Sequence, residues 1–311
     1  MYKFAFTYLV KQDKKNWNDF GISLKLLYQN ILKKLICDYK IIIFCEGNPS
    51  KNVRSYIDHL SKELNIKILI RKILLKDYVK RKKTENYLSE FPSNCSCIKS
   101  FSLGYRDMCK FFANDVFFDE VFDNVEYFIR MDTDSFFIYT NKIFLNKLES
   151  FNCDYGYIKN TVQNEDKSVT IGFGKCLYKF CKKNTNLISN FLNLCNEATL
   201  KPKIYYTNFE IVRLKWARSN IYKKFLAYII HSQGIYKFRW GDALIRYYVV
   251  NLLGASKDSL NGCLYKHSGI YDTRNFIRVF LTKAYSKLRN RLYSNIYEKK
   301  LSFLDKLFLG I

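Results

Sequence analysis

Apolar runs alternate with amphipathic segments over the first hundred residues of this 311-residue chain. Residues 3–10 and 66–75 are apolar runs, and residues 40–45 are a continuous β-branched run, which is typical of a strand buried on both faces. Two intervening segments have helical spacing: one covers residues 24–35, and the other begins after Ser50, a favourable N-cap. This β-α-β-α-β order predicts a parallel sheet flanked by helices.

The pattern is interrupted at residues 76–100, where a basic run and a Ser/Asn/Cys stretch predict a surface loop. A further apolar strand is predicted at residues 127–131, and it ends abruptly at Asp132 and Asp134. A more helical half follows, and its last predicted helix ends at Gly254, a residue type that favours a helix C-terminus. Helices are predicted to begin at three favourable N-terminal residues: Ser102, Ser219 and Asp242.

The composition indicates a globular protein with anionic partners. Hydrophobic residues make up 48% of the chain and aromatic residues 17%, which is enough to fill a sizeable core. The formal net charge of +24 favours nucleic acid, an acidic lipid surface or phosphorylated small molecules as partners. An alternative interpretation remains open, in which much of this charge reflects AT-rich codon usage on a solvated surface.

Neither a membrane span nor an export signal is evident in the sequence. No apolar run reaches the roughly 18–20 residues that a spanning helix needs, and the first apolar stretch lacks a signal-peptide cleavage pattern. We therefore expect a cytoplasmic or peripheral membrane location. The ten cysteines lack the paired C-x2-C spacing of a zinc site, so free thiols are expected.

The C-terminal 37 residues differ in composition from the rest, so we divide the chain into residues 1–274 and a basic amphipathic helical extension at residues 275–311. Two interpretations of this extension remain open. In the first, the helix packs on the part formed by residues 1–274. In the second, it lies on an anionic membrane surface, because its basic residues surround one apolar face.

The strongest local signal for chemistry is the pair Asp132 and Asp134, which directly follows an apolar strand. The pair therefore lies at the carboxyl edge of the predicted sheet, where open α/β folds bind their ligands. Residues two apart on an extended chain point to the same side, so the two carboxylates share one side. Two such carboxylates repel each other unless a cation lies beside them. A Mg²⁺ or Mn²⁺ bound there is suited to bridge the diphosphate of a sugar nucleotide.

Four blocks of sequence resemble one known family. Residues 102–112, 208–211 (NFEI), 239–243 (RWGDA) and 264–267 (LYKH) are similar, in order and separation, to motifs of the fungal α-1,2-mannosyltransferases, glycosyltransferase family 15. The resemblance covers a little over half of the chain. It implies a GT-A fold with a Rossmann-like mixed sheet flanked by helices, GDP-mannose as the donor, Mn²⁺ or Mg²⁺ as the cofactor, and retaining transfer to a mannoside hydroxyl of a glycan, glycoprotein or glycolipid.

The same resemblance implies roles for individual residues. Asp132, Asp134 and His267 match the positions that bind the metal, although Asp132-Thr133 replaces a Glu-Pro pair of the family. Glu210 matches a glutamate proposed as the nucleophile or as the stabiliser of the sugar cation, and Asp242 matches an acid near the acceptor. Further donor contacts are expected from Lys11, Tyr105 and Arg130, and acceptor contacts from Tyr206, Arg239 and Trp240.

Three alternatives to mannosyl transfer remain. The chain can use another sugar nucleotide, or it can be an inactive relative that binds only glycans or a membrane surface, as the departures at Thr133 and Leu244 allow. A basic nucleic-acid-binding protein is a further alternative. We expect no specific nucleic-acid partner, because the basic residues are dispersed and no RNA-recognition motif is present.

Overall fold

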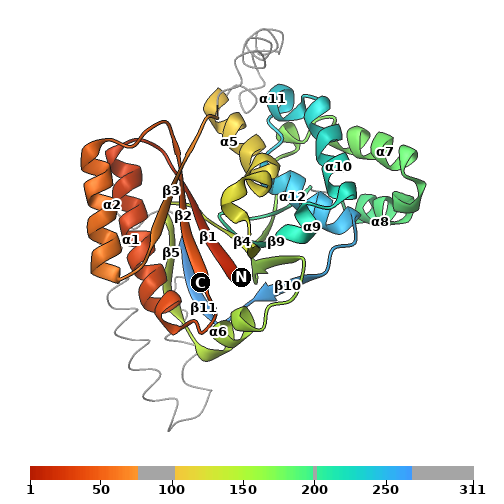
Figure 1. Cartoon of the computed structure of the whole chain (residues 1–311). Helices are drawn as coiled ribbons and strands as arrows, with labels where there is room; N and C mark the ends of the chain where they lie inside the picture. The colour runs from red at the N-terminus through yellow and green to blue at the C-terminus, as the bar shows by residue number, and fades with distance from the viewer. Residues whose placement is uncertain (76–101, 199–201, 268–311) are drawn as a thin grey trace, which may run out of the picture.

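The computed structural model describes residues 1–75, 102–198 and 202–267. The predicted surface loop at residues 76–100 and the predicted extension at residues 275–311 lie outside these ranges. A seven-stranded mixed sheet runs through the centre of the described part, in the order β10-β6-β9-β4-β1-β2-β3 (Figure 1). Its strands are β1 (Tyr2–Val10), β2 (Tyr39–Glu46), β3 (Ile68–Ile73), β4 (Val125–Met131), β6 (Tyr155–Ile158), β9 (Phe209–Arg213) and β10 (Lys257–Leu260).

The first half of the sheet is parallel, as the sequence predicts. β3, β2, β1 and β4 pair in parallel, and β9 inserts antiparallel to both β4 and β6. The five residues Ile41 to Cys45 of β2 are all buried, which confirms the prediction of a strand covered on both faces. Two small antiparallel pairs complete the strands: β5 (Ser135–Thr140) with β11 (Cys263–His267), and β7 (Val162–Asn164) with β8 (Lys203–Tyr205).

Helices cover both faces of the sheet (Figure 1). Leu24 of α1 and Leu60 of α2 pack on the face that carries Phe6 of β1, whereas Phe112 of α5 and Leu244 of α12 belong to the apolar core on the opposite face. The helices are α1 (Lys14–Asn30), α2 (Lys51–Leu64), α5 (Leu103–Ala113), α6 (Lys142–Glu149), α7 (Phe173–Lys183), α8 (Ile188–Ala198), α9 (Leu214–Ala217), α10 (Asn220–His231), α11 (Gly234–Phe238) and α12 (Asp242–Leu252).

The helix boundaries follow local capping chemistry. The side chains of Ser50, Ser102 and Ser219 accept hydrogen bonds from backbone N–H groups at the starts of α2, α5 and α10, which confirms these predicted caps. The prediction of a helix at residues 24–35 was wrong at both ends. α1 begins ten residues earlier, at Lys14, where Asp13 caps it through a 2.9 Å bond from the Asn16 backbone N–H, and the α-helix ends at Asn30.

Candidate active site

A cavity of about 780 Å³ opens at the carboxyl ends of the parallel strands. Its walls come from the segments that follow β1, β2, β3 and β4 and from the first turns of α5. Parallel strands place their carboxyl ends at one edge of a sheet, and this edge is where open α/β folds bind ligands. Among the lining residues are the predicted donor contacts Lys11, Tyr105, Asp132 and Asp134.

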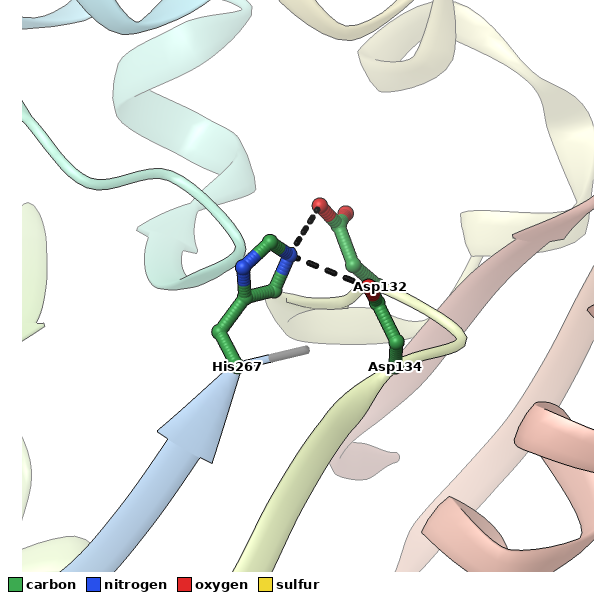
Figure 2. A group of neighbouring side chains, drawn as sticks. All are labelled: Asp132, Asp134 and His267. Atoms are coloured by element: carbon green, nitrogen blue, oxygen red, sulfur yellow. Dashed lines mark ion pairs between the residues drawn. The ribbon is translucent and has the colours of Figure 1, made fainter. Parts of the chain in front are cut away.

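Asp132, Asp134 and His267 converge beside this cavity (Figure 2). The two aspartates lie in the turn between β4 and β5, and His267 is the last residue of β11. Antiparallel pairing of β11 with β5 sets His267 opposite Ser135, next to Asp134. The His267 Nε2 atom lies 3.1 Å from Asp134 Oδ1 and 3.7 Å from Asp132 Oδ2. One potential ligand atom from each residue lies within 4.8 Å of the others.

The donor set of this cluster fits a divalent cation. Two carboxylate oxygens and one imidazole nitrogen form a mixed oxygen and nitrogen set, which Mn²⁺ accepts better than Ca²⁺ does. Burial disfavours the charged imidazolium, but hydrogen bonds to Asp132 and Asp134 outweigh this effect and raise the pKa of His267 to about 9. Burial likewise opposes the ionised form of Asp132, and the Arg130 guanidinium still holds its pKa below the usual value.

Tyr206 orients the histidine of the cluster. Its hydroxyl lies 3.0 Å from His267 Nδ1, and the two rings meet edge to face. In the tautomer whose Nε2 lone pair faces the aspartates, Nδ1 carries the proton. The Nδ1–H group then donates a hydrogen bond to the tyrosine oxygen. Such outer contacts fix the tautomer and ring orientation of metal-binding histidines. The structure therefore places Tyr206 behind the cluster, whereas the sequence predicts it as an acceptor contact, and that contact stays a prediction.

Arg130 links the cation cluster to Asp242. Its guanidinium is buried, donates from Nε to Asp132 Oδ1 at 2.9 Å, and also pairs with Asp242 Oδ2. The group lies over the Phe112 ring, with its Cζ atom 3.7 Å from the ring centroid. Thr207 donates a 2.8 Å hydrogen bond to the same Asp242 oxygen. Arg130 is therefore a support for two acidic side chains, while its predicted contact with the donor is untested.

Glu210 is fully buried and is paired with Arg246. Its Oε2 accepts from Arg246 Nε at 2.8 Å, and its Oε1 accepts from Arg246 Nη2 at 3.3 Å. Burial disfavours the charge of Arg246, yet Glu210 raises the pKa of the guanidinium above its ordinary value. Glu210 thus lies against an arginine, whereas the family resemblance implies a place beneath a sugar ring. Its role as nucleophile or cation stabiliser stays a prediction.

The remaining predicted residues occupy different surroundings. Lys11 is largely exposed at the mouth of the cavity, 3.7 Å from Asp13. Arg239 ends α11 in a left-handed conformation and lies over the Tyr105 ring at 5.8 Å. Trp240 is buried, packs edge to face on Phe173, and donates from Nε1 to the Ile171 carbonyl at 2.9 Å. The structure therefore places the Trp240 ring in the core, and its predicted acceptor contact stays untested.

Sequence reasoning missed two supporting residues, Thr207 and Arg246. Thr207 carries no recognisable signal, because its partner Asp242 lies 35 positions away along the chain. Arg246 does carry one: it is a single charged residue within the apolar run that follows Asp242. An arginine in a buried helix needs a carboxylate nearby, so this position predicts a paired acid without identifying it.

Comparison with known proteins shows which family the chain resembles. A family model described as glycolipid 2-alpha-mannosyltransferase matches residues 6–279. The probable mannosyltransferase KTR3 of Saccharomyces cerevisiae is 30% identical over 148 residues, which cover 46% of this chain and 36% of KTR3. The glycolipid 2-alpha-mannosyltransferase of the same yeast is 27% identical over 149 residues, covering 46% of this chain and 33% of that protein. The matched region is thus only about a third of each relative.

Solved structures share the fold. The Mn/GDP form of core-mannan synthase A from Aspergillus fumigatus superposes with a TM-score of 0.69 at 16% identity, covering 86% of this chain and 75% of that chain. The S. cerevisiae mannosyltransferase Ktr4p in complex with GDP gives a TM-score of 0.65 at 18% identity, covering 86% and 71%. The predicted GT-A fold is confirmed. Because the family model spans most of the sequence, this chain belongs to the glycolipid 2-alpha-mannosyltransferase family.

Proposed function

We propose that the protein is a metal-dependent retaining glycosyltransferase that moves mannose from GDP-mannose to a hydroxyl of a mannoside, with α-1,2 linkage. The observation that carries this proposal is the convergence of Asp132, Asp134 and His267 at the wall of the cavity. The family membership and the solved Mn/GDP form of a neighbour with the same fold support the choice of cation and nucleotide. A glycan, glycoprotein or glycolipid is the proposed acceptor.

The proposed chemistry begins with the departure of a nucleoside diphosphate. A divalent cation, when bound, supplies positive charge that offsets the negative charge growing on this leaving group. Asp132, Asp134 and His267 are the residues that would hold the cation. Arg130 keeps the Asp132 carboxylate aimed at that position, and Tyr206 does the same for the imidazole of His267.

The acceptor side of the reaction is proposed to involve Asp242. The acceptor hydroxyl must lose a proton as the new bond forms, either to the departing phosphate or to a nearby carboxylate. Asp242 is held by Arg130 and Thr207 at the start of α12, so its position is defined before an acceptor arrives. Glu210 lies on β9 directly opposite Arg130 in the sheet register, and we propose it as the acid that favours the sugar cation.

Titration of the full chain with GDP-mannose tests this proposal. We expect binding and slow hydrolysis that need Mn²⁺ and disappear on chelation. The double variant D132N/D134N should lose the metal-dependent part of both. The matched control D58N replaces an exposed aspartate on α2 and should behave as the wild type. The proposal fails if no common sugar nucleotide gives metal-dependent binding or hydrolysis. If only another sugar nucleotide gave metal-dependent binding or hydrolysis, the protein would still be a glycosyltransferase, but mannose would not be the transferred sugar.

Location at a membrane is a separate part of the proposal. No helix within residues 1–75, 102–198 and 202–267 combines the length and apolarity needed to cross a bilayer. We propose that the basic segment at residues 275–311 binds an anionic membrane surface. Deleting it should weaken binding to anionic vesicles and spare donor hydrolysis, and equal vesicle binding by the shortened chain would contradict this role.

A further inference from the structure

One stretch of the chain is basic without any acidic residue. Residues 167–196 contain five lysines and no aspartate or glutamate, and they build α7 and the first part of α8. These two helices lie at the outer edge of the helical side, away from the central sheet (Figure 1). A charge imbalance of this size within a folded segment indicates an anionic partner when the lysines share one face.

Four of these lysines share the exposed face of α7, and we call Lys175, Lys179, Lys182 and Lys183 the α7 lysine face. The buried face of the helix holds Phe173, Cys176, Leu177, Phe180 and Cys181. Because the exposed positions recur at i, i+4 and i+7 or i+8, the ammonium groups project together from one side of the helix.

The lysines of the α7 lysine face differ from Lys25 and Lys147, which carboxylates balance. Lys25 lies 2.8 Å from Glu63, and Lys147 lies 2.8 Å from Asp258, so carboxylates balance these charges. Within the part of the chain that the structure describes, no member of the α7 lysine face forms an ion pair. Lys183 Nζ lies over the Tyr228 ring, 5.7 Å from its centroid, a contact that leaves the charge in place. The four charges are therefore not balanced by carboxylates and can meet an external anion.

Exposed apolar side chains lie at the same corner. Tyr178 lies between the lysines on α7 and is 53% exposed, and Leu192 on α8 is 54% exposed. Ile188 precedes Leu192 by one helical turn and is also exposed. α7 and α8 pack together, with the Tyr178 ring centroid 5.8 Å from that of Phe191. Aromatic and aliphatic residues flanked by lysines are typical of a surface that rests in the headgroup region of a bilayer.

We propose that the α7 lysine face, together with Tyr178 and Leu192, docks the protein on an anionic lipid bilayer. The lysines face the phosphate and carboxylate headgroups, and the apolar side chains enter the boundary of the acyl chains. A bilayer fits better than a nucleic acid, because the exposed aliphatic side chains of Ile188 and Leu192 cannot stack on bases, whereas acyl chains can bury them. Docking here is independent of donor binding and of the segment at residues 275–311.

Vesicle co-sedimentation of the full chain tests this docking surface. The variant K175Q/K179Q/K182Q/K183Q is compared with K33Q/K51Q/K62Q/K67Q, which removes four exposed lysines elsewhere. The probe is vesicles of phosphatidylcholine with 30% phosphatidylserine at low salt. Each lysine near such a surface contributes about fivefold to binding, so the first variant should bind at least tenfold more weakly than the control. Wild-type affinity should fall as salt shortens the screening length.

A fluorescence measurement then locates the contact. Tryptophan introduced by Y178W should be quenched by brominated anionic lipids, whereas tryptophan introduced by I36W, at a position that is 93% exposed, should not. Equal vesicle binding by both lysine variants would overturn the proposal, as would equal quenching at both positions. If the variant K175Q/K179Q/K182Q/K183Q lost oligonucleotide binding and kept vesicle binding, the result would overturn the proposal in favour of nucleic acid. Mn²⁺-dependent GDP-mannose binding, measured on the same samples, reports separately on the proposed activity.

Discussion

Replacing Arg246 by methionine should destabilise the protein strongly, because it leaves the buried Glu210 carboxylate without its hydrogen-bonded arginine, with only the Arg130 charge nearby. Both side chains are essentially inaccessible to solvent, and two hydrogen bonds of 2.8 and 3.3 Å join them. Two unit charges about 4 Å apart attract by about 4 kcal/mol at an effective dielectric constant near 20. Breaking a buried pair by removing one partner typically costs about 3–5 kcal/mol. We expect a loss of this size in R246M.

The double variant E210M/R246M separates the ion pair from the other contacts of Arg246. The arginine also donates to the Phe112 carbonyl and to the Tyr222 hydroxyl, and each lost hydrogen bond costs roughly 1 kcal/mol in both variants. The double variant contains no buried charge at either position, so the cost of desolvating the Glu210 carboxylate is removed as well. Its free energy of unfolding should therefore exceed that of R246M by at least about 2 kcal/mol.

Urea unfolding of the wild type, E210M, R246M and the double variant forms a complete thermodynamic cycle. The midpoint for R246M should fall by roughly 1–2 M, and the coupling energy should exceed about 2 kcal/mol. A coupling energy below about 0.5 kcal/mol would refute the ion pair. The cycle also bears on catalysis: if E210Q stays folded and still hydrolyses the donor at the wild-type rate, Glu210 acts in stability alone.

Three other changes test different parts of the structure. Y206F removes the hydroxyl that orients His267, so Mn²⁺ affinity should fall about 10–100-fold in calorimetry with the melting temperature nearly unchanged; unchanged affinity would contradict the orienting role. G234A places a methyl group into the Trp240 ring, so the free energy of unfolding should fall by roughly 1–3 kcal/mol; a fully stable variant would contradict the close packing. Burial raises the pKa of Asp19 to about 6, above the value of about 4 in an unfolded chain, so the folded state binds this proton more tightly and wild-type stability falls as pH rises between these values. The free energy of unfolding of D19N, relative to that of the wild type, should therefore increase from pH 4 to pH 6 by roughly 1–3 kcal/mol. Urea unfolding with chelator present measures this difference, and a difference that does not change with pH would contradict the raised pKa.

The sequence by itself determined the elements whose causes are local. A continuous β-branched run identifies β2, because a strand covered on both faces has no polar positions. Serine side chains that cap backbone N–H groups mark the starts of α2, α5 and α10, since a cap acts within three residues. The same locality places Asp132 and Asp134 at the edge of the sheet, directly after β4.

The family resemblance already implies that Asp132, Asp134 and His267 lie together, but the tertiary structure decided how they and the other side chains meet. The antiparallel register of β11 against β5 brings His267 to Asp134, and the register of β9 against β4 sets Glu210 opposite Arg130. Packing of α12 on the sheet then assigns Arg246 to Glu210. These partners lie far apart in the sequence, and the free energy that joins them depends on burial and distance. Neither quantity exists until the strands pair and the helices cover them.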